Sequence, residues 1–209
     1  MRISLLIGGL LALAVAWLGP LPELAEQAFF GHMLMHMLVV AVAAPLLSLA
    51  VAGSRFDPVE GLPSFFAPIP ASVGELILVW AWHAPGLHHM ARVDFIALLC
   101  EQSTFLLAGT WVWMSAFGGH ALQDGKRAAA GVIGLLLTSM HMTLLGALLA
   151  MAPRTIYHHQ TGFGSLTALQ DQHLGGAVMI LIGGIAYLSG GLMLTVVLLR
   201  QRVQRSEAT

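Results

Sequence analysis

The sequence is poor in charge and has almost no cysteine. Charged residues make up only 9% of the 209 residues, against about a quarter in an ordinary soluble domain. So few charges exclude a solvated globular surface, and they exclude disorder, which requires charge and few large apolar side chains. The single cysteine excludes a disulfide framework and any CxxC motif. A net charge of −1 excludes a basic surface for nucleic acid, and no glycine-rich phosphate loop indicates a nucleotide site.

Apolar residues are abundant instead. They account for 57% of the chain, and the mean hydropathy of +0.83 places it in a lipid bilayer. A membrane-spanning helix needs about 20 mostly apolar residues. The apolar runs therefore predict an all-α, polytopic bundle of about six transmembrane helices, forming one domain over residues 1–209. The predicted spans are about 3–19, 27–51, 71–83, 95–117, 128–152 and 174–199.

The first run has two interpretations. It can be a signal peptide with Arg2 as its basic end. Its apolar segment of seventeen residues is longer than most signal-peptide cores, and this favours a retained helix.

The positions of Lys and Arg predict the topology, because cytoplasmic loops carry an excess of positive charge. With six spans, both termini lie on the same side of the membrane. That side carries Arg2, Arg55, Lys126, Arg127, Arg200, Arg202 and Arg205, and the other carries Arg92 and Arg154. Seven against two predicts that both termini lie in the cytoplasm.

The ten histidines are distributed unevenly over this topology. Only His120 falls on the cytoplasmic side. The others lie in outer loops, at outer helix ends or within spans: His32, His36, His83, His88, His89, His141, His158, His159 and His173. A loop histidine is ordinarily just solvated, whereas an ionisable side chain inside the membrane is costly and usually functional. The histidine-rich side is therefore predicted to face the periplasm or exterior.

The segment His32-Met33-Leu34-Met35-His36-Met37 concentrates possible metal ligands in the second span. His32 and His36 are four residues apart, so they share one helical face and can bind one ion. Met35 lies three residues from His32, near the same face. Methionine is usually a core residue, but imidazole suits copper, zinc and iron, and thioether sulfur selects Cu(I). The combination favours copper, and Cu(I) over Cu(II).

The estimated depth below the outer membrane surface places residues of other spans at the level of this segment. At 1.5 Å per residue, His32 and His36 lie roughly 8 and 14 Å below the outer surface. Cys100 and Glu101 lie roughly 9 to 11 Å down the fourth span by the same rise. A carboxylate in lipid must be paired or ligating to be tolerated, whereas an inert buried thiol is an equally good interpretation of Cys100.

Further candidates lie above and below this layer. His141 is deeper, roughly 16 Å from the outer end of its helix. His83, Asp171 and His173 form a ring nearer the outer surface. The complete predicted set of metal ligands is His32, Met35, His36, His83, Cys100, Glu101, His141, Asp171 and His173. No residue lies in a convincing nucleophile motif, so we predict that the protein is not an enzyme.

Four motifs together resemble one known family, the polytopic, multi-span CtaG family of cytochrome c oxidase assembly factors. They cover about Phe30 to Met179 and are His32–Met37, Trp82-His83-Ala84-Pro85, His141–Leu149 and Asp171-Gln172-His173-Leu174-Gly175-Gly176. The resemblance implies an integral protein of the bacterial inner (plasma) membrane that assembles a haem-copper oxidase by delivering copper to an apo cytochrome c oxidase subunit. A periplasmic copper donor is the implied source.

The chain departs from the family pattern in two places. The family often carries histidines around a Glu-His pair in the fourth span, where this chain has Cys100-Glu101-Gln102. The departure removes an implied ligand and offers Cys100 instead, which would make the site softer. Ile180 stands where the family has an aromatic residue.

Three other functions fit the sequence. A b-type cytochrome would bind haem between His36 and His141, and its Soret band would be visible in purified protein. A copper transporter needs ligands that continue to the cytoplasmic side, where only His120 is found. A scaffold for oxidase assembly would bind no metal, and metal analysis of detergent-purified protein distinguishes it from the leading hypothesis.

The predicted topology can be tested by cysteine labelling. A cysteine at Thr161 should react with an impermeant reagent from outside, whereas one at Gln123 should react only after permeabilisation, because positive residues hold that loop in the cytoplasm. Labelling of position 123 from outside would invert the topology.

Overall fold

The computed structural model describes residues 1–119, 121, 124–157 and 163–207. His120, His158 and His159, and the labelling positions Gln123 and Thr161, lie outside these described residues. Helices make up all the regular structure in the described part, which confirms the all-α class. In chain order they are α1 (Arg2–Leu18), α2 (Leu21–Gln27), α3 (Phe29–Met37), the π-helix η1 (Leu38–Ala43), α4 (Ala44–Val51), α5 (Pro68–Trp82), α6 (Pro85–Val93), α7 (Phe95–Phe117), α8 (Gly125–Ala150) and α9 (Ala168–Glu207).

Within the described residues, four continuous helical stretches are long and apolar enough to cross a membrane. They are Phe29–Val51, Phe95–Phe117, Gly125–Ala150 and Ala168–Gln201. Helices α1 and α2, bent by 44° at the Gly19-Pro20 break, make up to a fifth span if they cross together. Helix α5 is a shorter apolar helix of 15 residues. The chain is therefore a multi-pass membrane protein, and the count of six spans stays a prediction.

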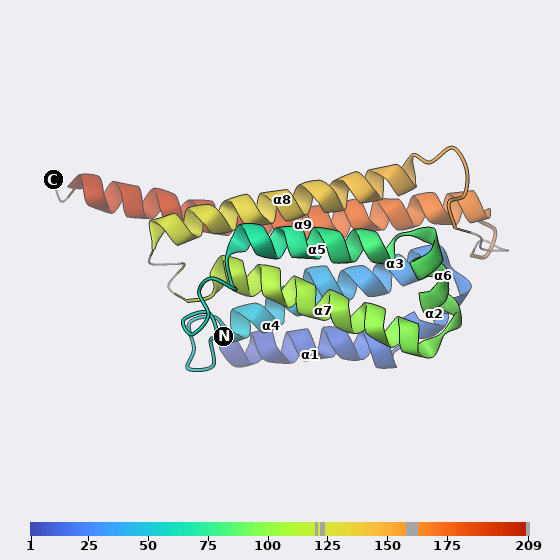
Figure 1. The fold of residues 1–209 in the computed structure, drawn as a ribbon, viewed down its shortest axis with the longest axis horizontal. Helices are drawn as coiled ribbons and strands as arrows, with labels where there is room; N and C mark the ends of the chain where they lie inside the picture. Colours follow the sequence, from blue (N-terminus) through green and yellow to red (C-terminus); the bar gives the residue numbers. More distant parts are fainter. Residues whose placement is uncertain (120, 122–123, 158–162, 208–209) are drawn as a thin grey trace.

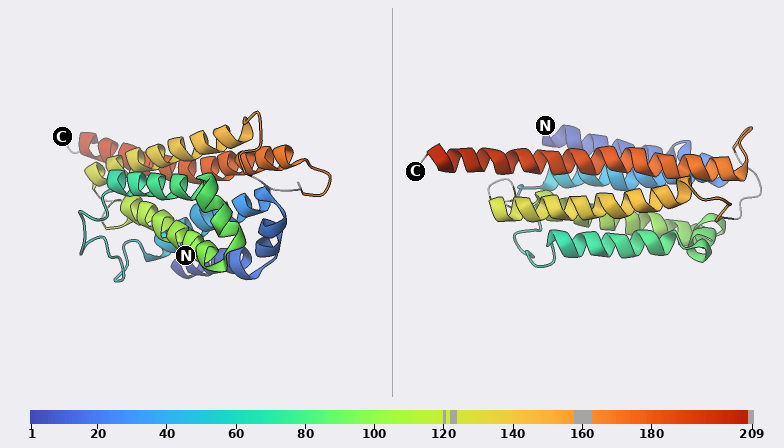
Figure 2. Two further views of the ribbon diagram at one scale, coloured as in Figure 1. Left: turned by 45° about the vertical axis from the view of Figure 1, so that its right-hand side comes forward. Right: turned by 90° about the horizontal axis from the view of Figure 1, so that it is seen from above.

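The long helices run side by side along the longest axis of the molecule (Figure 1). Helices α8 and α9 pair along one side of the bundle in Figure 1, where α1 and α4 form the opposite side. Helix α5 packs against α7 and α8, and seen from above it lies at one edge of the bundle with α1 at the opposite edge (Figure 2). Both chain termini lie at one end, and the short helices α2 and α6 lie together at the other (Figure 1). The candidate ligands described below gather near the α2–α6 end.

Helix α6 replaces the outer loop expected between the third and fourth spans. Pro85 occupies its first turn, where a fixed φ favours helix and no N–H is needed. Three residues apart, His88 and Ala91 face inward and are buried. A helix of nine residues is too short for hydropathy to distinguish from a loop, and this explains why the sequence did not predict it.

The second predicted span is interrupted by the wide turn η1, which ends just before α4. Pro45 lies in the first turn of α4. A proline cannot donate a backbone hydrogen bond, and its ring clashes with the carbonyl four residues earlier, which here belongs to Ala41. A π-turn accommodates both the missing hydrogen bond and the clash with the carbonyl group, and the helix continues.

Helices α8 and α9 approach each other closely at Gly146 and Gly176. A Cβ atom added at Gly176 would lie 2.5 Å from the backbone nitrogen of Ala150 and 2.5 Å from the carbonyl oxygen of Gly146. Backbone atoms cannot move aside as a side chain can. The close contact therefore depends on glycine, as is common where membrane helices pack.

We expect Gly176→Ala to destabilise the bundle, because overpacking of a tight interface costs about 1–3 kcal/mol. Gly184→Ala on the same helix is the matched control, since a Cβ there meets no atom within 4 Å. Thermal unfolding in detergent should show a lower Tm for Gly176→Ala and no loss for Gly184→Ala. Equal Tm values would contradict the packing described here.

Candidate functional site

Three buried side chains from three helices converge near the α2–α6 end of the bundle. They are His32 of α3, His88 of α6 and Glu101 of α7, and each offers one ligand atom within 4.8 Å of the other two. The Nε2 atom of His32 lies 3.2 Å from Oε1 and 3.1 Å from Oε2 of Glu101. All three side chains are at most 2% exposed. We call His32, His88 and Glu101 the outer cluster.

Neighbouring side chains hold the outer cluster in place. The Gln102 side-chain amide donates to Glu101 Oε2 over 3.1 Å, and Trp17 of α1 donates to Gln102 over 3.3 Å. Such supporting hydrogen bonds fix the orientation of a potential ligand. The ring of His88 lies 5.0 Å from that of His32 and 4.1 Å from that of Tyr157. Burial, followed by the charge of Glu101, raises the pKa of Tyr157, so its hydroxyl stays protonated.

His36 and His83 form a second pair, one helical turn from His32. Their rings lie 5.4 Å apart, and the His36 ring is 4.0 Å from Phe105. His83 Nδ1 lies 2.7 Å from the Val79 carbonyl oxygen. It must donate there, which leaves the lone pair on Nε2. Within the described residues, His83 Nε2 and both His36 nitrogens have no hydrogen-bond partner. Unpartnered buried nitrogens are costly, and a bound ligand would relieve this cost.

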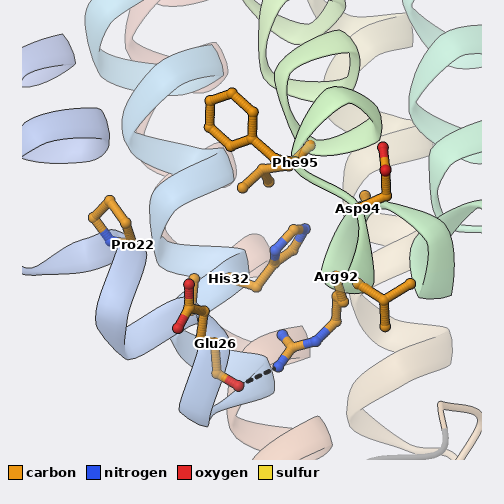
Figure 3. A pocket seen from close by; sticks show the side chains of 10 residues that line it. Pro22, Glu26, His32, Arg92, Asp94 and Phe95 are labelled. Carbon is orange, nitrogen blue, oxygen red and sulfur yellow. Dashed lines mark hydrogen bonds between the residues drawn. The ribbon is translucent and has the colours of Figure 1, made fainter.

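A pocket of about 230 Å³ connects the outer cluster to exposed acidic residues. Figure 3 shows His32 in this pocket, between Glu26 on one side and Arg92 and Asp94 on the other. Arg92 donates to the Glu26 backbone carbonyl over 2.8 Å. Burial lowers the pKa of Arg92, and the carboxylates of Asp171, Glu101 and Glu26 oppose this shift. Acidic groups around a pocket attract cations.

A comparison with known protein families identifies the family of this chain. The family model for the cytochrome c oxidase caa3 assembly factor (Caa3_CtaG) matches residues 1–201. The chain belongs to this family. The comparisons with curated proteins and with solved structures gave no match. The match runs from α1 into α9 and confirms the family predicted from the four motifs. Cytochrome c oxidase is therefore the partner that membership implies.

His88 is the ligand candidate of this Caa3_CtaG chain that sequence analysis missed. It was interpreted as a solvated loop histidine, because no helix was expected over 85–93. His89, its neighbour, is exposed as expected. The sequence pattern that could have predicted this helix is Pro85 followed by His88 and Ala91, three residues apart. So short a pattern does not identify a buried helix face.

Other predicted ligands lie outside the outer cluster of the assembly factor. Cys100 is exposed, because successive residues of a helix point about 100° apart and the buried face of α7 carries Glu101. His173 Nε2 lies 2.9 Å from the carbonyl oxygen of Ala152. His141 lies 3.9 Å from Glu75 instead.

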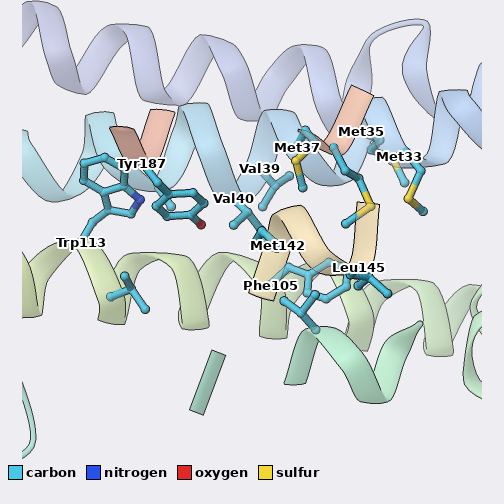
Figure 4. Packing of buried hydrophobic residues seen from close by; sticks show 14 of the residues in the cluster. Met33, Met35, Met37, Val39, Val40, Phe105, Trp113, Met142, Leu145 and Tyr187 are labelled. Atoms are coloured by element: carbon cyan, nitrogen blue, oxygen red, sulfur yellow. The ribbon is translucent and has the colours of Figure 1, made fainter. Parts of the chain in front are cut away.

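The methionines of the Caa3_CtaG chain pack in its apolar core. Figure 4 shows Met33, Met35 and Met37 in the cluster that also contains Phe105 and Leu145. Met33 contacts the Gly175 position of α9, and the sulfur of Met37 approaches Gly183. All three methionines thus contribute to apolar packing, and Met35 as a metal ligand stays a prediction.

Asp171 positions α3 from the first turn of α9. Its Oδ2 accepts a hydrogen bond from the Phe29 backbone N–H over 2.8 Å, and Oδ1 accepts one from Phe30 over 3.0 Å. Asp171 is fully buried. Two N–H groups at a helix start need such an acceptor, and negative charge there is favourable. Asp171 thus fixes the helix that carries His32 and His36.

We expect Asp171→Asn to destabilise the protein by about 1–3 kcal/mol, because one oxygen acceptor becomes an amide that faces a buried N–H. Asp124→Asn is the matched control. Asp124 caps α8 through a single exposed bond to Lys126 N, and asparagine caps helices equally well. Thermal unfolding of both variants in detergent checks the difference. An unchanged Tm for Asp171→Asn would contradict the capping role.

Proposed function

We propose that this Caa3_CtaG protein is a copper-binding membrane protein that holds copper for an apo cytochrome c oxidase subunit, and that it is not an enzyme. The observation that supports copper is the outer cluster, in which His32, His88 and Glu101 converge from three helices within 4.8 Å. Polar groups brought together at such depth in a membrane protein are mostly functional. Family membership alone supports the oxidase partner.

The chemistry of the outer cluster fits copper. Two imidazoles and one carboxylate can ligate a transition metal, and imidazole binds copper particularly well. His36 and His83 would offer further nitrogen ligands about one turn deeper, and their unpartnered atoms are in the state that binding requires. The negative charge of Glu101 would offset that of the cation. Imidazole binds both Cu(I) and Cu(II). Because the methionines pack in the apolar core, the ligands of the outer cluster favour Cu(I) less strongly than the His/Met pattern of the sequence indicates.

The pocket beside His32 is the route by which copper would reach the outer cluster. Exposed Glu26 and Asp94 would attract the ion, and the buried side chains behind them would replace its water ligands. We place this end of the bundle at the periplasmic face of the inner membrane, where a periplasmic donor would supply the metal and the oxidase subunit would receive it.

Copper binding is tested by the double variant His32→Ala/His88→Ala. Tightly bound copper, measured by mass spectrometry of purified protein after dialysis against a chelator, should fall from one equivalent to background, and oxidase activity in cells should fall with it. His89→Ala is the control, because His89 neighbours His88 on α6 but is exposed. Full copper content in the double variant would show that the site lies elsewhere. A Soret band in the wild-type protein would instead favour haem.

A further inference from the structure

A second group of ionisable side chains lies deeper in the bundle. Glu75 of α5, His141 of α8 and Tyr187 of α9 are 0%, 5% and 1% exposed. They come from three long helices and lie apart from the outer cluster. Sequence analysis placed His141 below the layer of His32 and His36 and did not include Glu75 among the predicted ligands.

The geometry of this group leaves two opposed atoms unsatisfied. The Tyr187 hydroxyl donates to Glu75 Oε1 over 3.0 Å. The other oxygen, Oε2, lies 3.9 Å from His141 Nε2, which is too far for a hydrogen bond. Among the described residues, neither atom has a partner with good hydrogen-bond geometry, although the Thr138 side chain lies close to the Glu75 carboxylate. Such orphaned buried groups are rare, and an ion between them is one physical explanation.

The surroundings hold the two groups in place. One turn nearer the chain termini, the Thr138 hydroxyl donates to Ser72 over 2.9 Å and ties α8 to α5. The Tyr187 ring stacks on Trp113 at 5.7 Å between centroids, and Figure 4 shows these two rings side by side within the apolar cluster. The Glu75 carboxylate is thus oriented before any ligand arrives.

Helix α5 aligns this deep group with the outer histidines. Glu75, Val79 and His83 are spaced by four residues, so they lie along one face of α5. The eight residues from Glu75 to His83 correspond to about 12 Å along the axis. His83 in turn contacts His36. Possible metal ligands therefore continue from the outer cluster toward the middle of the bundle.

The separation of the two orphaned atoms suits a metal ion. Bonds from a transition metal such as zinc to imidazole nitrogen or carboxylate oxygen are about 2.0–2.2 Å long. One ion can bridge two such atoms when they are no more than about 4 Å apart, and Glu75 Oε2 and His141 Nε2 are separated by 3.9 Å. A shared proton would instead draw them within hydrogen-bond distance.

We propose that Glu75 and His141 form a second, weaker copper site in the middle of the bundle, with Tyr187 as a positioning residue for the carboxylate. This proposal rests on the copper-binding function proposed above. Two ligands bind an ion less tightly than three, and a site on a path must release the ion that it accepts. The deep site would therefore serve transfer of copper along the bundle.

Titration of the detergent-purified full chain with Cu²⁺ against a chromophoric chelator tests the deep site. The wild type should bind two equivalents, the second at least tenfold more weakly. Glu75→Gln should lose only the weaker equivalent, because the amide keeps the shape and accepts from Tyr187 but carries no charge. His32→Ala/His88→Ala should lose only the tighter one. A wild type with one equivalent, or Glu75→Gln with both, would overturn the deep site.

Tyr187→Phe separates positioning from folding. Loss of the hydroxyl should weaken the second equivalent by about tenfold, as is typical when a supporting hydrogen bond of a ligand is removed, and the unchanged first equivalent shows that the bundle is still folded. Ser189→Ala on the same helix is the control, because Ser189 is exposed. Electron paramagnetic resonance of the second Cu²⁺ should show coupling to one imidazole nitrogen, absent in His141→Ala. Coupling that persists in His141→Ala would assign this ion to other ligands.

Discussion

The contact between His32 and Glu101 joins α3 to α7 at a point where both side chains are almost completely buried. A buried carboxylate without partners would be costly in an apolar bundle, so the two helices must keep their register as long as Glu101 stays inside. Gln102 and Trp17 extend this constraint to α1, and Asp171 extends it to α9 through the start of α3. Contacts from α1 and α9 thus help to hold the outer cluster in place.

Much of the fold follows from apolar runs and their breaks. The spans predicted at 27–51 and 95–117 agree closely with Phe29–Val51 and Phe95–Phe117, because hydropathy and Gly or Pro breakers act locally. Helix α9 extends beyond the predicted 174–199 to Ala168–Glu207, since helix propensity continues where hydropathy ends. Short helices such as α6 are stabilised by the residues they cover, and that information lies elsewhere in the chain.

The candidate site could be predicted only in part, for the same reason. The rise of a helix placed Glu101 in the layer of His32, and the two are in contact. Rotation about the helix axis depends on which face packs, so equal depth could not separate exposed Cys100 from buried Glu101. Asp171 was a plausible ligand by residue type, yet its role as a helix cap depends on α3, 141–142 residues away. Glu75 gained a role only when α8 and α9 were placed beside it.

The π-turn η1 has a consequence for how α3 and α4 are related. A π-turn holds one residue more than an α-turn, so it acts as a single-residue insertion that rotates everything after it by about 100°. The stripe that carries His32 and His36 nevertheless continues past η1, because His32 contacts Glu101, His36 contacts Phe105, and Val40 and Ala44 approach Gly109, all on α7. The extra residue keeps Ala44 and Ser48 on the face that packs against α7, where the Ser48 hydroxyl donates to the Thr110 carbonyl oxygen. One face of this span therefore presents histidines to α7 near the α2–α6 end and small residues to α7 nearer the chain termini.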